Sequence, residues 1–215
     1  MSKYNRQTPC VFIDIEAMFH GIPKNASTSI KHLLYEANYG RKFQGPGQWI
    51  HKGNEKGGCI YPSLAAVQSV VYESFKHFTV VRNPFDRFIS FYTDLCLGST
   101  NLRAELPPFF TDNNIQARGF TVDQAVDMVC EYTNDDEIDE HIASQSSFVY
   151  VDNCDVLKME ALDCDWGVMC KKLNIDYHPV PVYNKSNTTV HLTEEQKDKL
   201  YDRYKQDFER FKYER

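Results

Sequence analysis

Short apolar runs alternate along this chain with longer segments in which apolar residues recur every three or four positions. The apolar runs predict strands at Val11–Ile15, Ala17–Ile22, Phe78–Arg82, Phe148–Val151 and Val156–Met159. The longer segments predict helices at Thr28–Asn38, Ser63–Lys76, Pro84–Cys96, Val122–Tyr132, Trp166–Leu173 and from Thr193 onward. Strands that alternate with helices are typical of an α/β protein with a mainly parallel sheet.

Several of the predicted helices carry signals at their first residues. Capping boxes are present in Thr121-Val122-Asp123-Gln124 and Thr193-Glu194-Glu195-Gln196. Asn83-Pro84 places an N-cap residue directly before a proline at the first helical position. The helix that follows has an apolar face, formed by Phe85, Phe88, Ile89 and Tyr92.

The composition is that of a soluble globular protein. With 215 residues, 42% hydrophobic and 25% charged, the chain is expected to form a single domain, residues 1–215. The net charge of −6 argues against a nucleic-acid partner. No apolar stretch has the length of a membrane span, and residues 1–7 lack the apolar core of a signal peptide. We therefore expect a cytoplasmic protein without a membrane span.

The seven cysteines are scattered and form no Cys-x-x-Cys pair. Such a set is typical of reduced thiols, and it does not have the spacing of a structural zinc site. We expect no metal. Positive charge gathers locally in the segments that carry the candidate chemistry, at Lys24, Lys31, Arg82, Arg87 and Lys185.

The segment Gly21–Lys31 lies between a predicted strand and a predicted helix. A loop in this position can hold a phosphate at the helix N-terminus, where free N–H groups and the helix dipole favour an anion. The P-loop of nucleoside triphosphatases has the order Gly-x-x-x-x-Gly-Lys-Ser/Thr. Here Lys24 comes first and Thr28 and Ser29 follow, so the sequence predicts a phosphorylated nucleotide bound by a different loop.

A second candidate segment begins at Arg82, at the carboxyl end of a predicted buried strand. Ligands of open α/β sheets bind at this end of the strands. Ser90 follows two turns into the next predicted helix.

Together the two segments resemble the sulfotransferases that use 3′-phosphoadenosine-5′-phosphosulfate (PAPS), in particular the carbohydrate sulfotransferase-like family. That family grips the 5′-phosphosulfate with Pro-Lys-x-x-x-Thr-Ser and the 3′-phosphate with Arg-x-Pro-x-x-Arg-x-x-Ser. Both patterns occur here in that order, as Pro23–Ser29 and Arg82–Ser90. The resemblance implies a P-loop-like three-layer fold, a central sheet flanked by helices. It also implies a 5′-site formed by Pro23, Lys24, Asn25, Ala26, Ser27, Thr28 and Ser29.

Two further elements are similar to the same family. His141-Ile142-Ala143-Ser144-Gln145 keeps the spacing of a His-Trp-x-Pro-Gln element but lacks its Trp and Pro. His141 and Gln145 are thus candidates for the acceptor site or for a structural role. Lys185 and Ser186 are expected to cover the nucleotide, as the family's C-terminal loop does.

Each candidate also has a plainer interpretation. Lys24 is expected to neutralise charge at the bridging oxygen of the phosphosulfate, and the alternative is a solvated surface lysine. Thr28 and Ser29 could serve as helix caps. For Arg82 the alternative to 3′-phosphate binding is a salt bridge, and Ser90 could simply be a small helical residue. Arg87 is expected to form a structural ion pair.

An acceptor hydroxyl or amine needs a general base. Family members use a histidine or glutamate between the two phosphate motifs, which makes His51 the first candidate and Glu55 the second. For His51 the alternative is an exposed loop histidine.

The sequence therefore predicts a PAPS-dependent sulfotransferase that transfers a sulfuryl group to an acceptor, by resemblance a carbohydrate hydroxyl. The alternatives are an ATP-dependent small-molecule kinase and a non-catalytic nucleotide- or glycan-binding module.

Overall fold

The computed structural model describes residues 9–45, 50–51, 60–67, 69, 72–98, 107–181 and 189–215. The chain folds into two compact units, each assembled from segments that are separated in the sequence. The sheet unit consists of Gln7–Val81 and Phe148–Tyr183. The helical unit consists of the described residues of Arg82–Ser147 and Asn184–Arg215.

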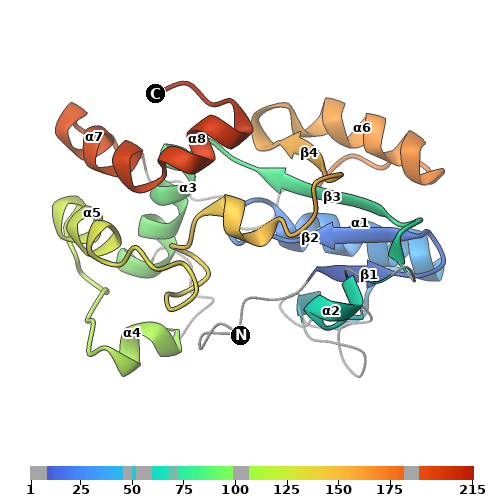
Figure 1. Ribbon diagram of the computed structural model, residues 1–215, viewed down its shortest axis with the longest axis horizontal. Helices are drawn as coiled ribbons and strands as arrows, with labels where there is room; N and C mark the ends of the chain where they lie inside the picture. Colours follow the sequence, from blue (N-terminus) through green and yellow to red (C-terminus); the bar gives the residue numbers. More distant parts are fainter. Residues whose placement is uncertain are drawn as a thin grey trace. The chain divides into compact units, whose positions relative to one another are not determined.

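A four-stranded sheet runs through the sheet unit in the order β1 (Cys10–Phe12), β2 (Ala17–His20), β3 (Lys76–Val81) and β4 (Asp155–Lys158) (Figure 1). The β1 strand is antiparallel to β2, whereas β2, β3 and β4 are mutually parallel. In the register of the central pair, Phe19 lies opposite Phe78. The predicted mainly parallel sheet is confirmed.

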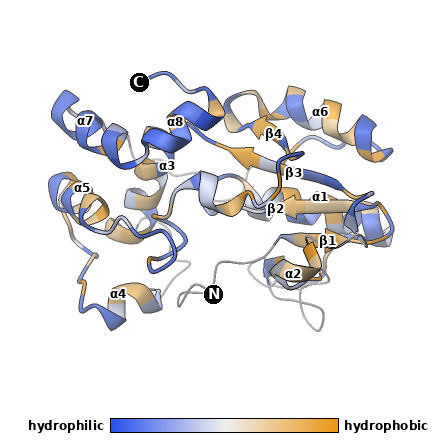
Figure 2. Cartoon of the chain, viewed as in Figure 1, coloured by the Kyte–Doolittle hydropathy of each residue, from blue (hydrophilic) through white to orange (hydrophobic). Residues whose placement is uncertain are grey.

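Side chains pack on both faces of this sheet. Successive residues of a strand point to opposite sides. Phe19 and Phe78 pack on one face with α1 (Ser27–Tyr39) and α6 (Leu162–Leu173). Met18 packs on the other face with Val67 of the short helix α2 (Leu64–Val67). The sheet thus has helices on both sides, and Figure 2 shows that its strands are largely hydrophobic.

Two predicted elements of the sheet unit are wrong. Within Ser63–Lys76 the described residues form only the short α2 and a turn, and the apolar Tyr72 and Phe75 pack on the sheet from that turn. The predicted strand Phe148–Val151 is absent, since Gln145–Phe148 forms the 3-10 turn η4. In both places apolar residues cover the sheet from irregular backbone.

The helical unit begins with α3 (Pro84–Phe91), which continues into the π-helical turn η3 (Tyr92–Cys96). The Asn83 side chain accepts a hydrogen bond from the Phe85 amide, as the sequence predicts. The unit also contains α4 (Pro108–Asp112), α5 (Val122–Glu131), α7 (Glu194–Arg203) and α8 (Lys205–Phe211).

Both predicted capping boxes are present, at the starts of α5 and α7. The last predicted helix is interrupted at Tyr204, which lies between α7 and α8 and donates a hydrogen bond to the Ile142 carbonyl at 2.8 Å. Among the described residues, no helix is both long enough and apolar enough to cross a membrane.

Candidate functional site

The loop Pro23–Ser29 joins β2 to α1 in the sheet unit. Lys24 and Ala26 adopt the left-handed conformation, with φ of 72° and 53°, whereas Asn25 between them does not. A left-handed conformation costs a residue other than glycine roughly 1–2 kcal/mol, and a backbone that alternates in this way turns successive N–H groups toward one side. The alternating backbone conformation therefore favours an anion-binding concavity.

The start of α1 adds to this concavity. Its N-cap residue, Ala26, makes no side-chain capping bond. The amide of Ile30 donates to the Ala26 carbonyl at 3.0 Å, and the amides before it belong to the first turn, which lacks partners within the helix. An anion at this helix end is favoured by both the free amides and the dipole.

Asn25 holds the loop on the sheet. Its side chain is fully buried, and Nδ2 donates to the carbonyl of Val80 in β3 at 3.0 Å. The sequence assigns Asn25 to nucleotide binding, and the structure shows that its side chain faces the sheet. Its backbone amide is committed as well, since it donates to the Ile22 carbonyl at 3.3 Å, so the described bonds of Asn25 hold the loop in place.

The hydroxyls of Thr28 and Ser29 differ in what they contact. Ser29 Oγ is buried and donates its hydrogen to the Pro181 carbonyl at 2.7 Å. Thr28 Oγ1 lies 2.9 Å from Nε2 of His51. Only Thr28 therefore has a hydroxyl hydrogen that is not already committed to a carbonyl.

His51 is placed beside the start of α1. In addition to its contact with Thr28, its Nδ1 lies 3.0 Å from Nζ of Lys31. Lys31 is buried, which its charge alone did not indicate in the sequence. The other proposed base, Glu55, lies outside the described residues, as do Lys185 and Ser186.

The Arg82 segment belongs to the helical unit. The Arg82 amide donates to Oε1 of Gln145 at 2.9 Å, and Nε2 of Gln145 donates back to the Arg82 carbonyl at 2.8 Å. Gln145 is fully buried, and its side-chain amide pairs with both backbone groups of Arg82 in the way that a neighbouring strand would. This pairing holds the backbone from which the Arg82 side chain projects.

Asp207 of α8 supports Gln145 in turn. Its two carboxylate oxygens accept from the amides of Gln145 and Ser146, at 2.7 and 2.8 Å. Burial raises the pKa of Asp207, and these amides and the nearby Arg87 oppose that shift. Nothing in the local sequence of Asp207 indicated this role.

Arg87 is almost completely buried and donates to the carbonyls of Ala143 and Glu140, at 2.7 and 3.1 Å. Burial lowers the pKa of its guanidinium, while nearby acidic groups favour the charged form. The hydrogen bonds that the structure shows run to backbone carbonyls and give Arg87 a structural role, whereas the ion pair that the sequence suggested stays a prediction.

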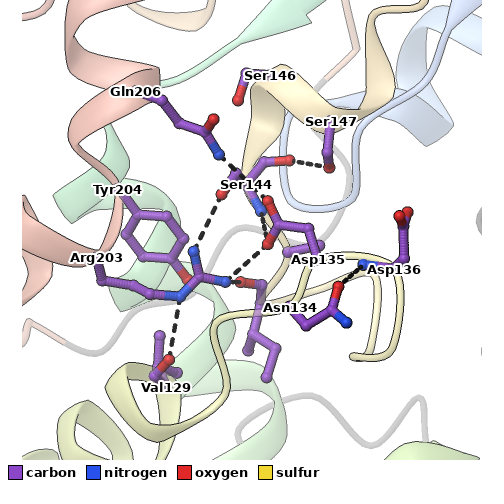
Figure 3. Close-up of polar contacts among 12 residues, drawn as sticks. Val129, Asn134, Asp135, Asp136, Ser144, Ser146, Ser147, Arg203, Tyr204 and Gln206 are labelled. Carbon is purple, nitrogen blue, oxygen red and sulfur yellow. Dashed lines mark hydrogen bonds and ion pairs between the residues drawn. The ribbon is translucent and has the colours of Figure 1, made fainter.

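A second arginine, Arg203, connects α7 to Asp135 and Ser144 (Figure 3). Its guanidinium donates to Asp135, Ser144 and the Val129 carbonyl. Burial alone would raise the pKa of Asp135, but Arg203 and the Ser144 hydrogen bonds hold it below its usual range. Asp135 is therefore part of a largely buried network, and its side chain is only 16% exposed.

His141 is buried beside Asp139, and its Nδ1 lies 2.6 Å from the carboxylate. Ser90, by contrast, is half-buried on α3. Among the residues of the helical unit that the sequence singles out, Gln145 thus lies against Arg82, whereas His141 pairs with Asp139.

The sheet face opposite to that of Phe19 and Phe78 carries a pair of histidines. Nε2 of His20 lies 3.1 Å from Nδ1 of His77, and Nδ1 of His20 lies 3.1 Å from the Phe148 carbonyl. Burial lowers the pKa of His20 to about 4, and it also lowers the pKa of His77. Both rings are therefore neutral at pH 7 and structural in their contacts.

A comparison with known families decides the relationship. The model of the sulfotransferase family matches residues 13–214, nearly the whole chain. The chain belongs to the sulfotransferase family. No curated protein and no solved structure matches it. Membership confirms the resemblance found in the sequence, and the α/β architecture with its mostly parallel sheet agrees with the P-loop-like fold of this family.

Proposed function

We propose that this sulfotransferase takes a sulfuryl group from PAPS and transfers it to an acceptor hydroxyl, that of a carbohydrate, releasing adenosine 3′,5′-bisphosphate. The family supports sulfuryl transfer in general terms. The donor is inferred from the two ordered motifs and from the geometry of each segment, and the carbohydrate acceptor is inferred from the resemblance alone.

The observation that carries the proposal is the strained loop at the start of α1. Lys24 and Ala26 are both left-handed, and the helix has no side-chain cap. An amide-lined concavity with a lysine and a threonine hydroxyl fits a phosphate group. We assign the 5′-phosphosulfate to the backbone of residues 26–29, to Lys24 and to the Thr28 hydroxyl.

The 3′-phosphate is assigned to Arg82 and Ser90. A guanidinium binds a phosphate through two parallel hydrogen bonds, and the Gln145 side chain binds both the amide and the carbonyl of Arg82. We propose that Gln145 acts through Arg82 and that His141 has a structural role beside Asp139. Lys185 and Ser186 remain the proposed cover of the nucleotide.

PAPS supplies a sulfuryl group on an anionic phosphate leaving group. Lys24 is proposed to neutralise the charge that develops on this leaving group, which is the main contribution that a protein makes to such in-line transfers. The acceptor proton needs a base. Both ring nitrogens of His51 have partners in the structure, Thr28 and Lys31, so Glu55 is the first base to test.

Isothermal titration with adenosine 3′,5′-bisphosphate, ADP and AMP tests the donor site. We expect a clear preference for the bisphosphate, and we expect Arg82→Ala to remove that preference. Lys205→Ala is the matched control, because it removes an exposed cation of the same unit. Equal binding of ADP would instead support a kinase.

Turnover is tested separately, with PAPS and a panel of sugar acceptors. Release of the bisphosphate that depends on an acceptor supports the transferase. Tight bisphosphate binding without turnover on any acceptor would instead support a non-catalytic nucleotide- or glycan-binding module.

A further inference from the structure

A buried lysine lies one turn into α1, behind the loop assigned to the 5′-phosphate. Lys31 is 2% exposed. Its Nζ lies 3.0 Å from Nδ1 of His51 and 3.1 Å from the Tyr61 hydroxyl, and it sits 5.3 Å from the centre of the Tyr61 ring. A buried ammonium is costly unless it is hydrogen-bonded. The bonds to His51 and Tyr61 therefore hold the Lys31 side chain in place.

The contact with Lys31 determines which nitrogen of His51 carries the proton. An ammonium group has only donors, so Nδ1 of His51 must accept. A neutral imidazole then carries its hydrogen on Nε2, which lies 2.9 Å from Thr28 Oγ1. His51 therefore donates to the Thr28 hydroxyl.

This donation determines the direction of the Thr28 hydroxyl. A hydroxyl whose oxygen accepts a hydrogen bond keeps its own hydrogen for another acceptor. Thr28 is the second residue of α1, at the helix end where an anion is favoured. A chain of hydrogen bonds thus runs from Lys31 through His51 to Thr28. Each bond is donated in the direction of the proposed phosphate.

Gly21 provides separate support for this arrangement. A Cβ atom at Gly21 would lie 3.3 Å from the Phe19 ring, 3.4 Å from Cε of Lys31 and 3.7 Å from its Nζ. The distance to the Phe19 ring is tighter than usual, whereas those to Lys31 are ordinary van der Waals contacts, so the end of the Lys31 side chain packs against the backbone that leads into the loop.

We infer that Lys31 is a positioning residue that holds His51 as an Nε2–H donor, and that His51 orients the Thr28 hydroxyl as a donor to the 5′-phosphate. The inference rests on the proposed function. It gives His51 a role on the nucleotide, which differs from the base that the sequence suggested.

The first test measures the side-chain nitrogens of His51 by ¹⁵N NMR in the ligand-free protein. We expect hydrogen on Nε2 and a hydrogen-bonded, unprotonated Nδ1. In Lys31→Met we expect the two neutral tautomers to mix. Hydrogen on Nδ1 in the unchanged protein would overturn the inference, whatever the protein binds.

The second test measures affinity for adenosine 3′,5′-bisphosphate. Lys31→Met, His51→Ala and Thr28→Val should each weaken binding about tenfold, the usual effect of one charge-assisted hydrogen bond. The double variant Lys31→Met/Thr28→Val should lose little more than either single variant, since both act through one hydroxyl. Losses that multiply would overturn the inference.

Two conservative variants separate positioning from folding and from base catalysis. His51→Gln keeps an amide donor for Thr28 and should bind the bisphosphate several-fold more tightly than His51→Ala, and Thr28→Ser should restore most of the affinity lost in Thr28→Val. A base that acts only on the acceptor would leave bisphosphate affinity unchanged in His51→Ala, and this result would overturn the inference while the proposed function stands. Failure of the unchanged protein to bind the bisphosphate would overturn the proposed function and, with it, the role of Lys31 toward a phosphate.

Discussion

The Pro23–Ser29 loop of the sheet unit and the Arg82 segment of the helical unit differ in where their support comes from. The loop owes its shape to its own backbone, through the left-handed Lys24 and Ala26 and the adjoining start of α1. Arg82 is held by Gln145, 63 residues away in the sequence, and Gln145 is held by Asp207. Main-chain groups can form an anion site locally, whereas a side chain that must reach a phosphate needs its own backbone to be held in place.

The difference also concerns charge. Beside the loop, one buried cation, Lys31, contacts neutral His51 and Tyr61. Behind Arg82, the buried Arg87 and Arg203 lie among carboxylates, with Asp135 and Asp207 acting on both. We therefore expect the loss of Asp207 to affect stability first, and the loss of Lys24 to affect the nucleotide first.

The largest effect is expected at Lys24. Lys24→Ala should lower kcat by about 10²–10³, the usual loss on removing a group that stabilises transition-state charge. Because Lys24 is left-handed, Lys24→Gly should be more stable than Lys24→Ala by about 1 kcal/mol. Steady-state kinetics and urea unfolding measure the two quantities, with Lys171→Ala as a control on the exposed side of α6. A kcat within threefold of the unchanged protein would remove Lys24 from the chemistry.

Asp207 should show the opposite balance. Asp207→Ala leaves the amides of Gln145 and Ser146 without their acceptor, near the buried Arg87. We expect the free energy of unfolding to fall by about 3 kcal/mol, as it does when one member of a buried charged network is removed. Urea unfolding measures this loss, and the control is Asp202→Ala on the exposed surface of α7. A loss below 1 kcal/mol would contradict the proposed support of Arg82.

The histidine pair predicts a pH dependence specific to the sheet unit. The pKa of folded His20 is about 4, against 6.5 for an unperturbed histidine. Between these values the unfolded chain binds more protons, so stability should fall as the pH decreases from 6.5 to about 4. The full contribution is about 3 kcal/mol.

Urea unfolding at several pH values tests this expectation, with His20→Gln as the comparison. The variant should show a flatter profile between pH 6.5 and 4, whereas His178→Gln, at an exposed position, should keep the original slope. An unchanged slope in His20→Gln would place the pH dependence elsewhere.

Gln145 should control selectivity more than stability. Gln145→Leu removes both hydrogen bonds to the Arg82 backbone, and we expect the preference for adenosine 3′,5′-bisphosphate over AMP to fall about tenfold, or 1.4 kcal/mol. Gln145→Glu keeps an acceptor for the Arg82 amide and should show an intermediate loss. Equal weakening of both nucleotides would indicate a general structural effect instead.

The smallest effect is expected at Ser29. Ser29→Ala removes the bond to the Pro181 carbonyl, so the free energy of unfolding should fall by about 1 kcal/mol. Its effect on bisphosphate affinity should be smaller than that of Thr28→Val. An equal loss of affinity in the two variants would show that the Ser29 hydroxyl contacts the phosphate.

The elements that the sequence predicted well have their determinants nearby. The strand that became β3 is a short apolar run, and the Asn83-Pro84 start of α3 is a local cap. The predicted helix Ser63–Lys76 failed because its apolar spacing is satisfied by packing on the sheet, where Tyr72 and Phe75 lie. Apolar spacing shows that residues are buried, but it does not show whether a helix, a strand or a turn carries them.

By itself, the sequence determined the position of the loop Pro23–Ser29 between a strand and a helix, the order of the two motifs and the alternation of strands and helices. These depend on residues that are neighbours along the chain. Only the tertiary structure decided that Ser29 holds Pro181, that Gln145 clamps Arg82 and that Lys31 holds His51. The physical reason is that a buried polar group must find a partner wherever the fold brings one within hydrogen-bond distance, and that partner is usually distant in the sequence.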